Sequence, residues 1–229
     1  MELGGNAPLI VFEDADLDTA VTGTILAKMR NLGEACTAAN RIYVHEKIAE
    51  AYTAKLTAAM AALKVGAGTY PSVDVGPLVN ADTRDKVAAF VADAVAKGAK
   101  IEIGGKAPEG KGFFYPPTVL SNVSEDADCV HDEIFGPVAA LQTFTDTEDV
   151  IRRANDTEYG LVAYVFSEDF KRALQVCERL DYGMVGLNRG LVSDPAAPFG
   201  GTKQSGLGRE GGHEGMREFM ETQYISASW

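Results

Sequence analysis

The stretch Pro8-Leu9-Ile10-Val11-Phe12, followed by a helical repeat and then by Arg41-Ile42-Tyr43-Val44-His45, decides the fold class of this chain. Both quoted runs are short and rich in branched or aromatic side chains, which is typical of buried strands. Between them, Asp14 or Asp16 can cap a helix that ends near Met29, with apolar residues at four-residue steps. A strand, a helix and a second strand in this order predict parallel strands joined by a helical crossover.

The same alternation continues through the rest of the chain, without a low-complexity linker or an internal repeat. It predicts an α/β domain with a mainly parallel sheet. A glycine-rich stretch over residues 200–215 precedes a short helix and a terminal strand at 223–227. The other expected helices cover 47–63, a segment from a cap at Asn80 or Asp82 to Gly98, 147–155 and 169–180, and the other expected strands cover 100–103, 114–120, 138–144, 162–166 and 184–188.

The composition is that of an ordinary globular protein, with 46% hydrophobic and 24% charged residues among 229. The net charge is −12 and no stretch concentrates Lys or Arg, which argues against nucleic-acid and anionic-membrane partners. Cys36, Cys129 and Cys177 form neither a disulfide framework nor a zinc pattern, and the three histidines form no ligand motif, so we expect no metal. Together with the absence of a signal-like start and of a long apolar run, this predicts a cytoplasmic location.

Two residues suggest covalent catalysis. Cys36 lies in the small-residue loop Gly33-Glu34-Ala35-Cys36-Thr37, where a helix ends and the chain turns toward a strand, so backbone N–H groups can face the thiolate. Glu2 precedes the flexible pair Gly4-Gly5 and could serve as a base that activates water. Taken alone, a single cysteine is more often a buried structural residue, and Glu2 would be an unremarkable carboxylate.

The pair Glu2 and Cys36 resembles the glutamate and cysteine motifs of the aldehyde dehydrogenase superfamily, in both sequence and spacing. Glu133-Ile134-Phe135-Gly136-Pro137 and the block 198–210 resemble two further motifs of that family. The resemblance implies a three-layer αβα catalytic domain over residues 1–221. It also implies a reaction in which the thiolate attacks an aldehyde, hydride passes to NAD or NADP, and the glutamate activates water to hydrolyse the thioester.

The resemblance also assigns residues to the cofactor. Glu133 would accept hydrogen bonds from the nicotinamide ribose hydroxyls, and Phe135 would pack against the nicotinamide ring. Lys86 falls where some relatives contact the adenosine ribose. The alternative for Glu133 and Phe135 is a turn before a strand with a core phenylalanine, and for Lys86 it is a solvated lysine on a helix.

For the substrate, the resemblance favours the branch of the family that oxidises succinate semialdehyde. Arg30 and Ser193 would hold the distal carboxylate of that substrate, Phe199 would line the substrate tunnel, and Glu210 would lie near a proton-relay position. The alternative for Arg30 is a surface arginine on a helix. The second hypothesis for an enzyme is a dehydrogenase for glutarate semialdehyde or for a neutral aldehyde.

The resemblance covers only the C-terminal half of a normal family member. We therefore expect the nicotinamide-binding domain to be absent from residues 1–229, and these residues alone to be inactive as a dehydrogenase. Residues 222–229 would form an oligomerisation strand of a dimer or tetramer. Two other hypotheses stay open: an assembly module that pairs residues 224–227 with a neighbouring sheet, and a cysteine esterase that needs no hydride acceptor.

Overall fold

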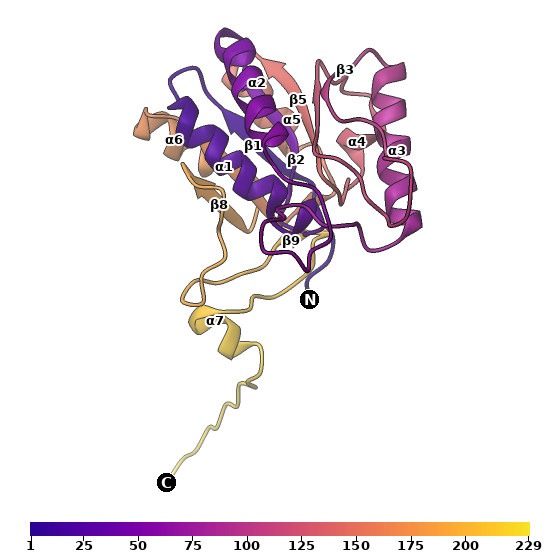
Figure 1. Cartoon of the computed structure of the whole chain (residues 1–229). Coiled ribbons are helices and arrows are strands. Elements are labelled where there is room, and N and C mark those ends of the chain that lie inside the picture. Colours follow the sequence, from indigo (N-terminus) through magenta and orange to yellow (C-terminus); the bar gives the residue numbers. More distant parts are fainter.

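The computed structural model describes residues 1–229, and its centre is a seven-stranded sheet with the order β3-β4-β5-β2-β1-β7-β8 (Figure 1). Only β3 runs antiparallel to its neighbour, so the expected mainly parallel α/β sheet is confirmed. The strands are β1 (Ala7–Val11), β2 (Ala39–His45), β3 (Lys100–Ile103), β4 (Thr118–Ser121), β5 (Val138–Phe144), β7 (Val162–Phe166) and β8 (Met184–Leu187).

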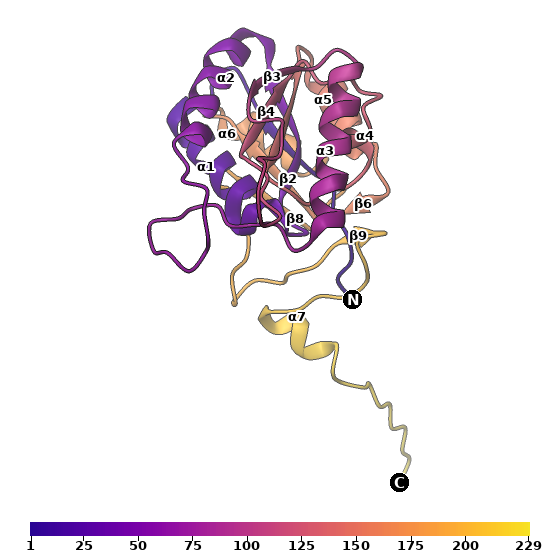
Figure 2. The same cartoon turned by 45° about the vertical axis from the view of Figure 1, so that its right-hand side comes forward.

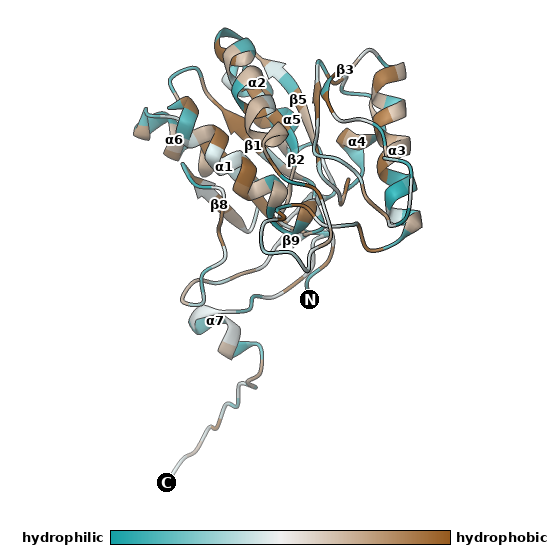
Figure 3. Cartoon of the chain, viewed as in Figure 1, coloured by the Kyte–Doolittle hydropathy of each residue, from teal (hydrophilic) through white to brown (hydrophobic).

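The strands at the centre of the sheet are buried on both faces. Every residue of β1, β2 and β7 is buried, and β1 is drawn in the brown of hydrophobic residues in Figure 3. Parallel strands need cover on both faces because their crossover helices lie there. β1 pairs with both β2 and β7, with Leu9 opposite Ile42 on one side and opposite Tyr164 on the other.

Helices cover the two faces of the sheet and give three layers. Helices α1 (Leu17–Met29) and α2 (Glu46–Ala61) pack on one face, in a core that contains Leu9, Ile42 and Leu141. The other face, with Ile10, Tyr43 and Ala140, is covered by four further helices (Figures 1 and 2). These are α3 (Ala81–Ala96), α4 (Asp128–His131), α5 (Thr147–Asn155) and α6 (Phe170–Cys177).

Local signals fix the helix ends. Asp16, rather than Asp14, caps α1 by accepting a hydrogen bond from the Thr19 N–H at 2.8 Å. Asn80, rather than Asp82, caps α3. Gly98 follows α3 with φ of +99°, the left-handed conformation in which glycine commonly ends a helix, as the sequence predicts.

The structure contains the short helix α4 and three other features that the sequence analysis did not predict. After α1, a 3-10 turn, η1 (Arg30–Gly33), holds Asn31 and Leu32 with positive φ. A separate two-stranded ladder pairs β6 (Tyr159–Gly160) with β9 (Thr202–Lys203). The short C-terminal helix, α7 (Gly212–Arg217), begins inside the glycine-rich stretch rather than after it.

The last residues extend away from the body of the domain (Figures 1 and 2). The strand expected at 223–227 is not formed within this chain, because no other strand lies beside it to share hydrogen bonds. Pairing of residues 222–229 with a neighbouring chain stays a prediction. No helix combines the length and the apolar character needed to cross a bilayer.

Candidate active site

The three residues that carry the predicted chemistry precede three neighbouring strands. Glu2 precedes β1, Cys36 precedes β2 and Glu133 precedes β5, and these strands are adjacent in the sheet. Because all three strands are parallel, their amino ends meet at one edge. The topology alone therefore brings together three residues that are far apart in the sequence.

The Cys36 loop lies directly against the turn that carries Glu133. Gly33 has φ of +78°, and a side chain there would collide with the carbonyl oxygen of Gly136. Cys36 is half-buried, and burial raises the pKa of its thiol, with further increases from the negative charges of Glu2 and Glu133. The backbone N–H groups of Cys36 and Thr37 act in the opposite direction on this pKa, as expected for donors that face the sulfur.

The segment that carries Glu2 is held by the glycine-rich block near the C-terminus. The Leu3 N–H donates to the Ser205 carbonyl at 3.0 Å, and the Ser205 hydroxyl donates to the Gly4 carbonyl at 2.8 Å. Gly5 approaches Cys36 so closely that a side chain there would collide with the Cys36 carbonyl. The Glu2 side chain is exposed, and desolvation followed by the charge of Glu210 raises its pKa.

Glu133, Phe135 and Lys86 form one cluster near Cys36. The Gly5 N–H donates to Glu133 Oε1 at 3.2 Å, whereas Oε2 accepts no hydrogen bond within the chain. Lys86 Nζ donates to the Glu133 carbonyl at 3.2 Å and lies 5.9 Å from the centre of the Phe135 ring. Burial raises the pKa of Glu133, against the lowering effects of the Gly5 N–H and of Lys86. An available carboxylate oxygen beside an aromatic ring fits a ribose and its attached flat ring.

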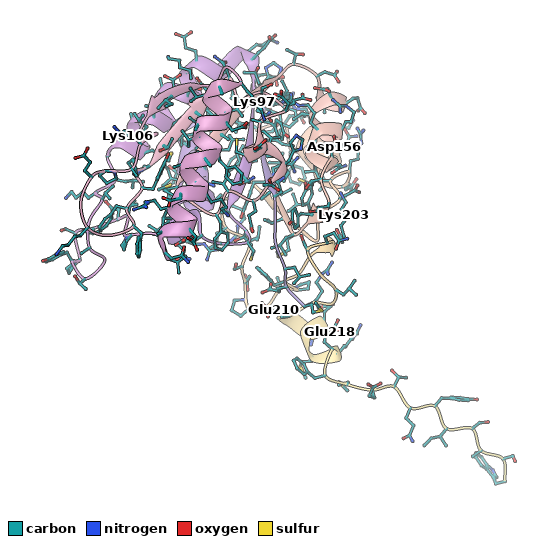
Figure 4. All side chains as sticks on the ribbon, turned by 90° about the vertical axis from the view of Figure 1, so that its right-hand side faces the viewer. Lys97, Lys106, Asp156, Lys203, Glu210 and Glu218 are labelled. Atoms are coloured by element: carbon teal, nitrogen blue, oxygen red, sulfur yellow. The ribbon has the colours of Figure 1, made fainter.

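A hollow of about 480 Å³ opens beside Cys36. Phe199 and Glu210 in its wall are paired through their backbones, with N–H to carbonyl distances of 2.6 and 2.8 Å. A smaller hollow of about 180 Å³ contains Glu2 and shares Phe199 and Glu210 with the first. Figure 4 shows Glu210 between the body of the domain and Glu218, near the start of the extended C-terminal segment. The predicted residues in the larger hollow are Arg30, Cys36, Ser193, Phe199 and Glu210.

Arg30 has no carboxylate partner in the structure. Its Nη2 donates to the Thr37 hydroxyl at 3.0 Å, which places the guanidinium next to the residue after Cys36. The Thr37 carbonyl in turn accepts from the buried Tyr164 hydroxyl at 2.8 Å, so β7 supports the same loop. A guanidinium that keeps free N–H groups beside a hollow can bind an anionic group of a ligand.

Sequence reasoning missed several buried residues around the site. Lys28, at the end of α1, is fully buried and its Nζ has no hydrogen-bond partner. Burial lowers its pKa to about 7, although the nearby Cys129 and Glu133 act in the opposite direction. Asn6 and Asn40 are also buried and join the loops of the site. Lys28 is the only charged residue in the last turn of α1, and the sequence carries no further sign of its burial. No group of His, Cys, Asp and Glu side chains is arranged to hold a metal ion.

Comparison with known proteins shows the family to which the chain belongs. Residues 1–225 match the model of the aldehyde dehydrogenase family. The chain belongs to the aldehyde dehydrogenase family. It is 57% identical over 225 residues to a succinate-semialdehyde dehydrogenase of Paenarthrobacter nicotinovorans, covering 98% of this chain and 50% of that protein. It is 48% identical over 225 residues to a glutarate-semialdehyde dehydrogenase of Pseudomonas aeruginosa, covering 98% of this chain and 47% of that protein.

Solved structures of aldehyde dehydrogenases have the same fold. The crystal structure of succinate-semialdehyde dehydrogenase from Burkholderia pseudomallei superposes with a TM-score of 0.94 at 52% identity, covering 96% of this chain and 45% of that one. The chain therefore spans about half the length of the family members that it matches. The aldehyde dehydrogenases are oxidoreductases.

Proposed function

We propose that residues 1–229 form the catalytic-domain part of an NAD(P)-dependent aldehyde dehydrogenase that oxidises succinate semialdehyde to succinate. The observation that carries this proposal is the hollow beside Cys36, which contains a guanidinium without a carboxylate partner and the Ser193 hydroxyl. A semialdehyde that extends from Cys36 to Arg30 would have its aldehyde at the thiol and its carboxylate at the guanidinium. Relatives that act on succinate and glutarate semialdehydes support an anionic substrate.

In the proposed mechanism, the Cys36 sulfur attacks the aldehyde carbon and forms a thiohemiacetal. Burial and two carboxylates raise the pKa of the thiol, so Cys36 must first release its proton to solvent to become the nucleophilic thiolate. The N–H groups of Cys36 and Thr37 would stabilise the negative charge that develops. After oxidation of the carbon to a thioester, Glu2 takes a proton from the attacking water, and hydrolysis returns Cys36 to its starting state. Glu210, which lies in the same hollow as Glu2 and acts on its pKa, could pass this proton on to solvent.

Glu133, Phe135 and Lys86 would hold the nicotinamide part of the cofactor. When bound, NAD or NADP accepts the hydride that leaves the substrate carbon. The free Oε2 of Glu133 is available to ribose hydroxyls, and the Phe135 ring offers a flat apolar face. Lys86 contacts both residues, so it supports this cluster even if it also reaches the adenosine ribose.

We further propose that residues 1–229 alone are not sufficient for dehydrogenation and that the active enzyme is a homo-oligomer. Residues 206–211, Gly-Leu-Gly-Arg-Glu-Gly, have the Gly-x-Gly-x-x-Gly spacing, but they lie outside the parallel sheet and in no βαβ unit, so they are not a dinucleotide-binding fingerprint. The second candidate substrate is glutarate semialdehyde, whose longer chain would need the same anion contact. The substrate tunnel would use Phe199 as its apolar wall.

A chimera tests the proposal. The upstream half of the Paenarthrobacter relative would be fused to residues 1–229, and NAD and NADP reduction would be measured with succinate semialdehyde, glutarate semialdehyde and butanal. We expect the highest kcat/KM with succinate semialdehyde. Cys36→Ala should reduce the rate by roughly 10⁴-fold or more, as removal of other catalytic nucleophiles does, whereas Cys177→Ala should retain it. Activity of Cys36→Ala above a thousandth of the original, or a preference for butanal, would contradict the proposal.

A further inference from the structure

Two buried asparagines stand at the same offset after the two residues proposed for catalysis. Asn6 follows Glu2 by the same number of positions as Asn40 follows Cys36. Asn6 is 1% exposed and Asn40 is 2% exposed. Buried amides are costly unless their donors and acceptors are paired, so the partners of these two side chains show what they stabilise.

Asn40 connects the nucleophile strand to the loop that carries Glu133. Its Nδ2 donates to the Cys129 carbonyl at 3.1 Å and to the Asp132 carbonyl at 3.0 Å. Its Oδ1 accepts from the Ile134 N–H at 2.9 Å. One amide therefore binds the backbone on both sides of Glu133.

Asn6 connects the strand of the Glu2 segment to the same loop. Its Nδ2 donates to the Val130 carbonyl at 2.9 Å and to the His131 carbonyl at 3.2 Å. The two amides also bind each other, since Asn40 Nδ2 lies 2.7 Å from Asn6 Oδ1. Buried Arg41 holds the Asn6 carbonyl through Nε and Nη2, at 3.2 and 2.8 Å.

We infer that the Asn6–Asn40 pair positions the carboxylates of Glu133 and Glu2 relative to the sulfur of Cys36. The pair and its partners link β1, β2 and the turn before β5, which are the three segments that carry these residues. Asn6 and Asn40 themselves touch none of the reacting atoms, so they act through the backbone. The importance of this positioning for catalysis rests on the proposed function. Its effect on the proton affinity of the Cys36 thiol does not depend on that function.

Neither a carboxylate nor a hydroxyl could replace these amides. Each amide donates through nitrogen to carbonyl groups and accepts through oxygen, from a backbone N–H in Asn40 and from the other amide in Asn6. An aspartate at position 40 would bury a negative charge against the carbonyl groups of Cys129 and Asp132. A serine would keep one polar atom but would be too short to bridge the two strands.

The pKa of Cys36 gives a direct readout of the positions of Glu2 and Glu133. Both carboxylates raise this pKa because negative charge disfavours the thiolate. If the pair releases them, the carboxylates can move away from the sulfur and the pKa of Cys36 should fall. A role in general stability would not produce this change in a protein that remains folded.

The experiment measures alkylation of Cys36 by iodoacetamide against pH in residues 1–229, with each cysteine followed separately by peptide mass spectrometry. Asn40→Ser and Asn6→Ser should each lower the apparent pKa of Cys36 by about 0.5 or more, and the double variant should show less than the sum of the two shifts. The matched control is Asn155→Ser. Its side chain also bridges two backbone groups, the Arg179 carbonyl and the Asp181 N–H, but lies outside the site.

An unchanged pH profile in both folded Asn variants, or an equal shift in Asn155→Ser, would overturn the inference. Unfolding of both variants, judged by circular dichroism, would overturn it too, because the pair would then be required for folding rather than for positioning. The assay uses neither aldehyde nor cofactor. A shifted profile together with an inactive chimera would support this inference and reject the proposed function. An unshifted profile together with an active chimera would reject this inference and support the proposed function.

Discussion

The amino ends of β1, β2 and β5 and the segment 210–229 both carry predicted site residues, but they are held in different ways. The first region is fixed by buried amides and by glycine contacts that bring Gly33 against Gly136. In the second region, Phe219 is 92% exposed, and the last residues have no core of their own. The fold of the domain therefore determines where Cys36 lies, whereas the surroundings of Glu210 depend on a segment with few contacts.

We expect the first region to determine the chemistry of the site and the second to determine association with other chains. Substitutions in the first region should change rates or the stability of the domain, because the loops that carry Glu2, Cys36 and Glu133 support one another. Changes in the last residues should leave the domain intact and affect its contacts with other chains.

Glu2→Gln in the chimera should lower the steady-state rate by roughly 10²–10⁴-fold, because glutamine cannot accept the proton of the attacking water. Acylation should survive, so stopped-flow measurement should show a burst of reduced cofactor followed by slow turnover. If burst and steady state fall together, Glu2 is instead needed to deprotonate Cys36.

The control for Glu2 is Glu210→Gln. The charge of Glu210 raises the pKa of Glu2, so its removal should move the acid limb of the rate profile to lower pH without abolishing turnover. A profile that stays in place would show that Glu210 does not act on Glu2.

Arg30→Ala in the chimera should lower kcat/KM for succinate semialdehyde by about 30- to 1000-fold, the range typical of losing a charge-assisted bond in a desolvated site. Butanal carries no carboxylate, so its kcat/KM should change little. Arg30→Lys should give an intermediate loss, because lysine keeps the charge but not the fork of donors. Equal losses for both aldehydes would mean that Arg30 only supports Thr37.

Lys28→Met should raise the free energy of unfolding at pH 7 by roughly 2–4 kcal/mol, because it removes a buried ammonium without a partner. The pKa of Lys28 is about 7 in the folded protein, against about 10.4 in an unfolded chain. Between these values the unfolded chain binds more protons, so the original protein gains stability as pH rises. The advantage of Lys28→Met should therefore shrink by about 2 kcal/mol between pH 7 and 9 in urea titrations. Parallel behaviour of the two proteins at both pH values would show that Lys28 is solvated or paired.

Helices and strands are predicted best from the sequence where each is determined by the residues within it. The strand at 138–144, the helix at 147–155 and the strand at 162–166 agree with the structure residue for residue. The alternation of apolar runs and the caps carry enough information there. The β6–β9 ladder has only two residues in each strand and joins distant segments, so no local period could indicate it.

The candidate site shows the same limit. Cys36, Glu2 and Glu133 could be predicted from motifs, and parallel strands explain why they meet. Asn6 and Asn40 belong to no charged or nucleophilic pattern, and their importance lies in pairings between segments that are distant in sequence. Lys28 required knowledge of its burial, since a lysine in the last turn of a helix is usually a solvated residue.

The smallest expected effect on stability comes from the C-terminal segment. Removal of residues 222–229 should change the free energy of unfolding by less than about 0.5 kcal/mol, because Tyr224 and Ile225 are exposed and pair with no strand of the same chain. Sedimentation should nevertheless show weaker self-association, since an extended apolar segment can add a strand to a neighbouring sheet. Ile225→Lys should reproduce the effect and Glu221→Lys, just before the segment, should not. A large loss of stability with unchanged association would mean that the segment folds back onto its own domain, and the division between the two regions would then fail.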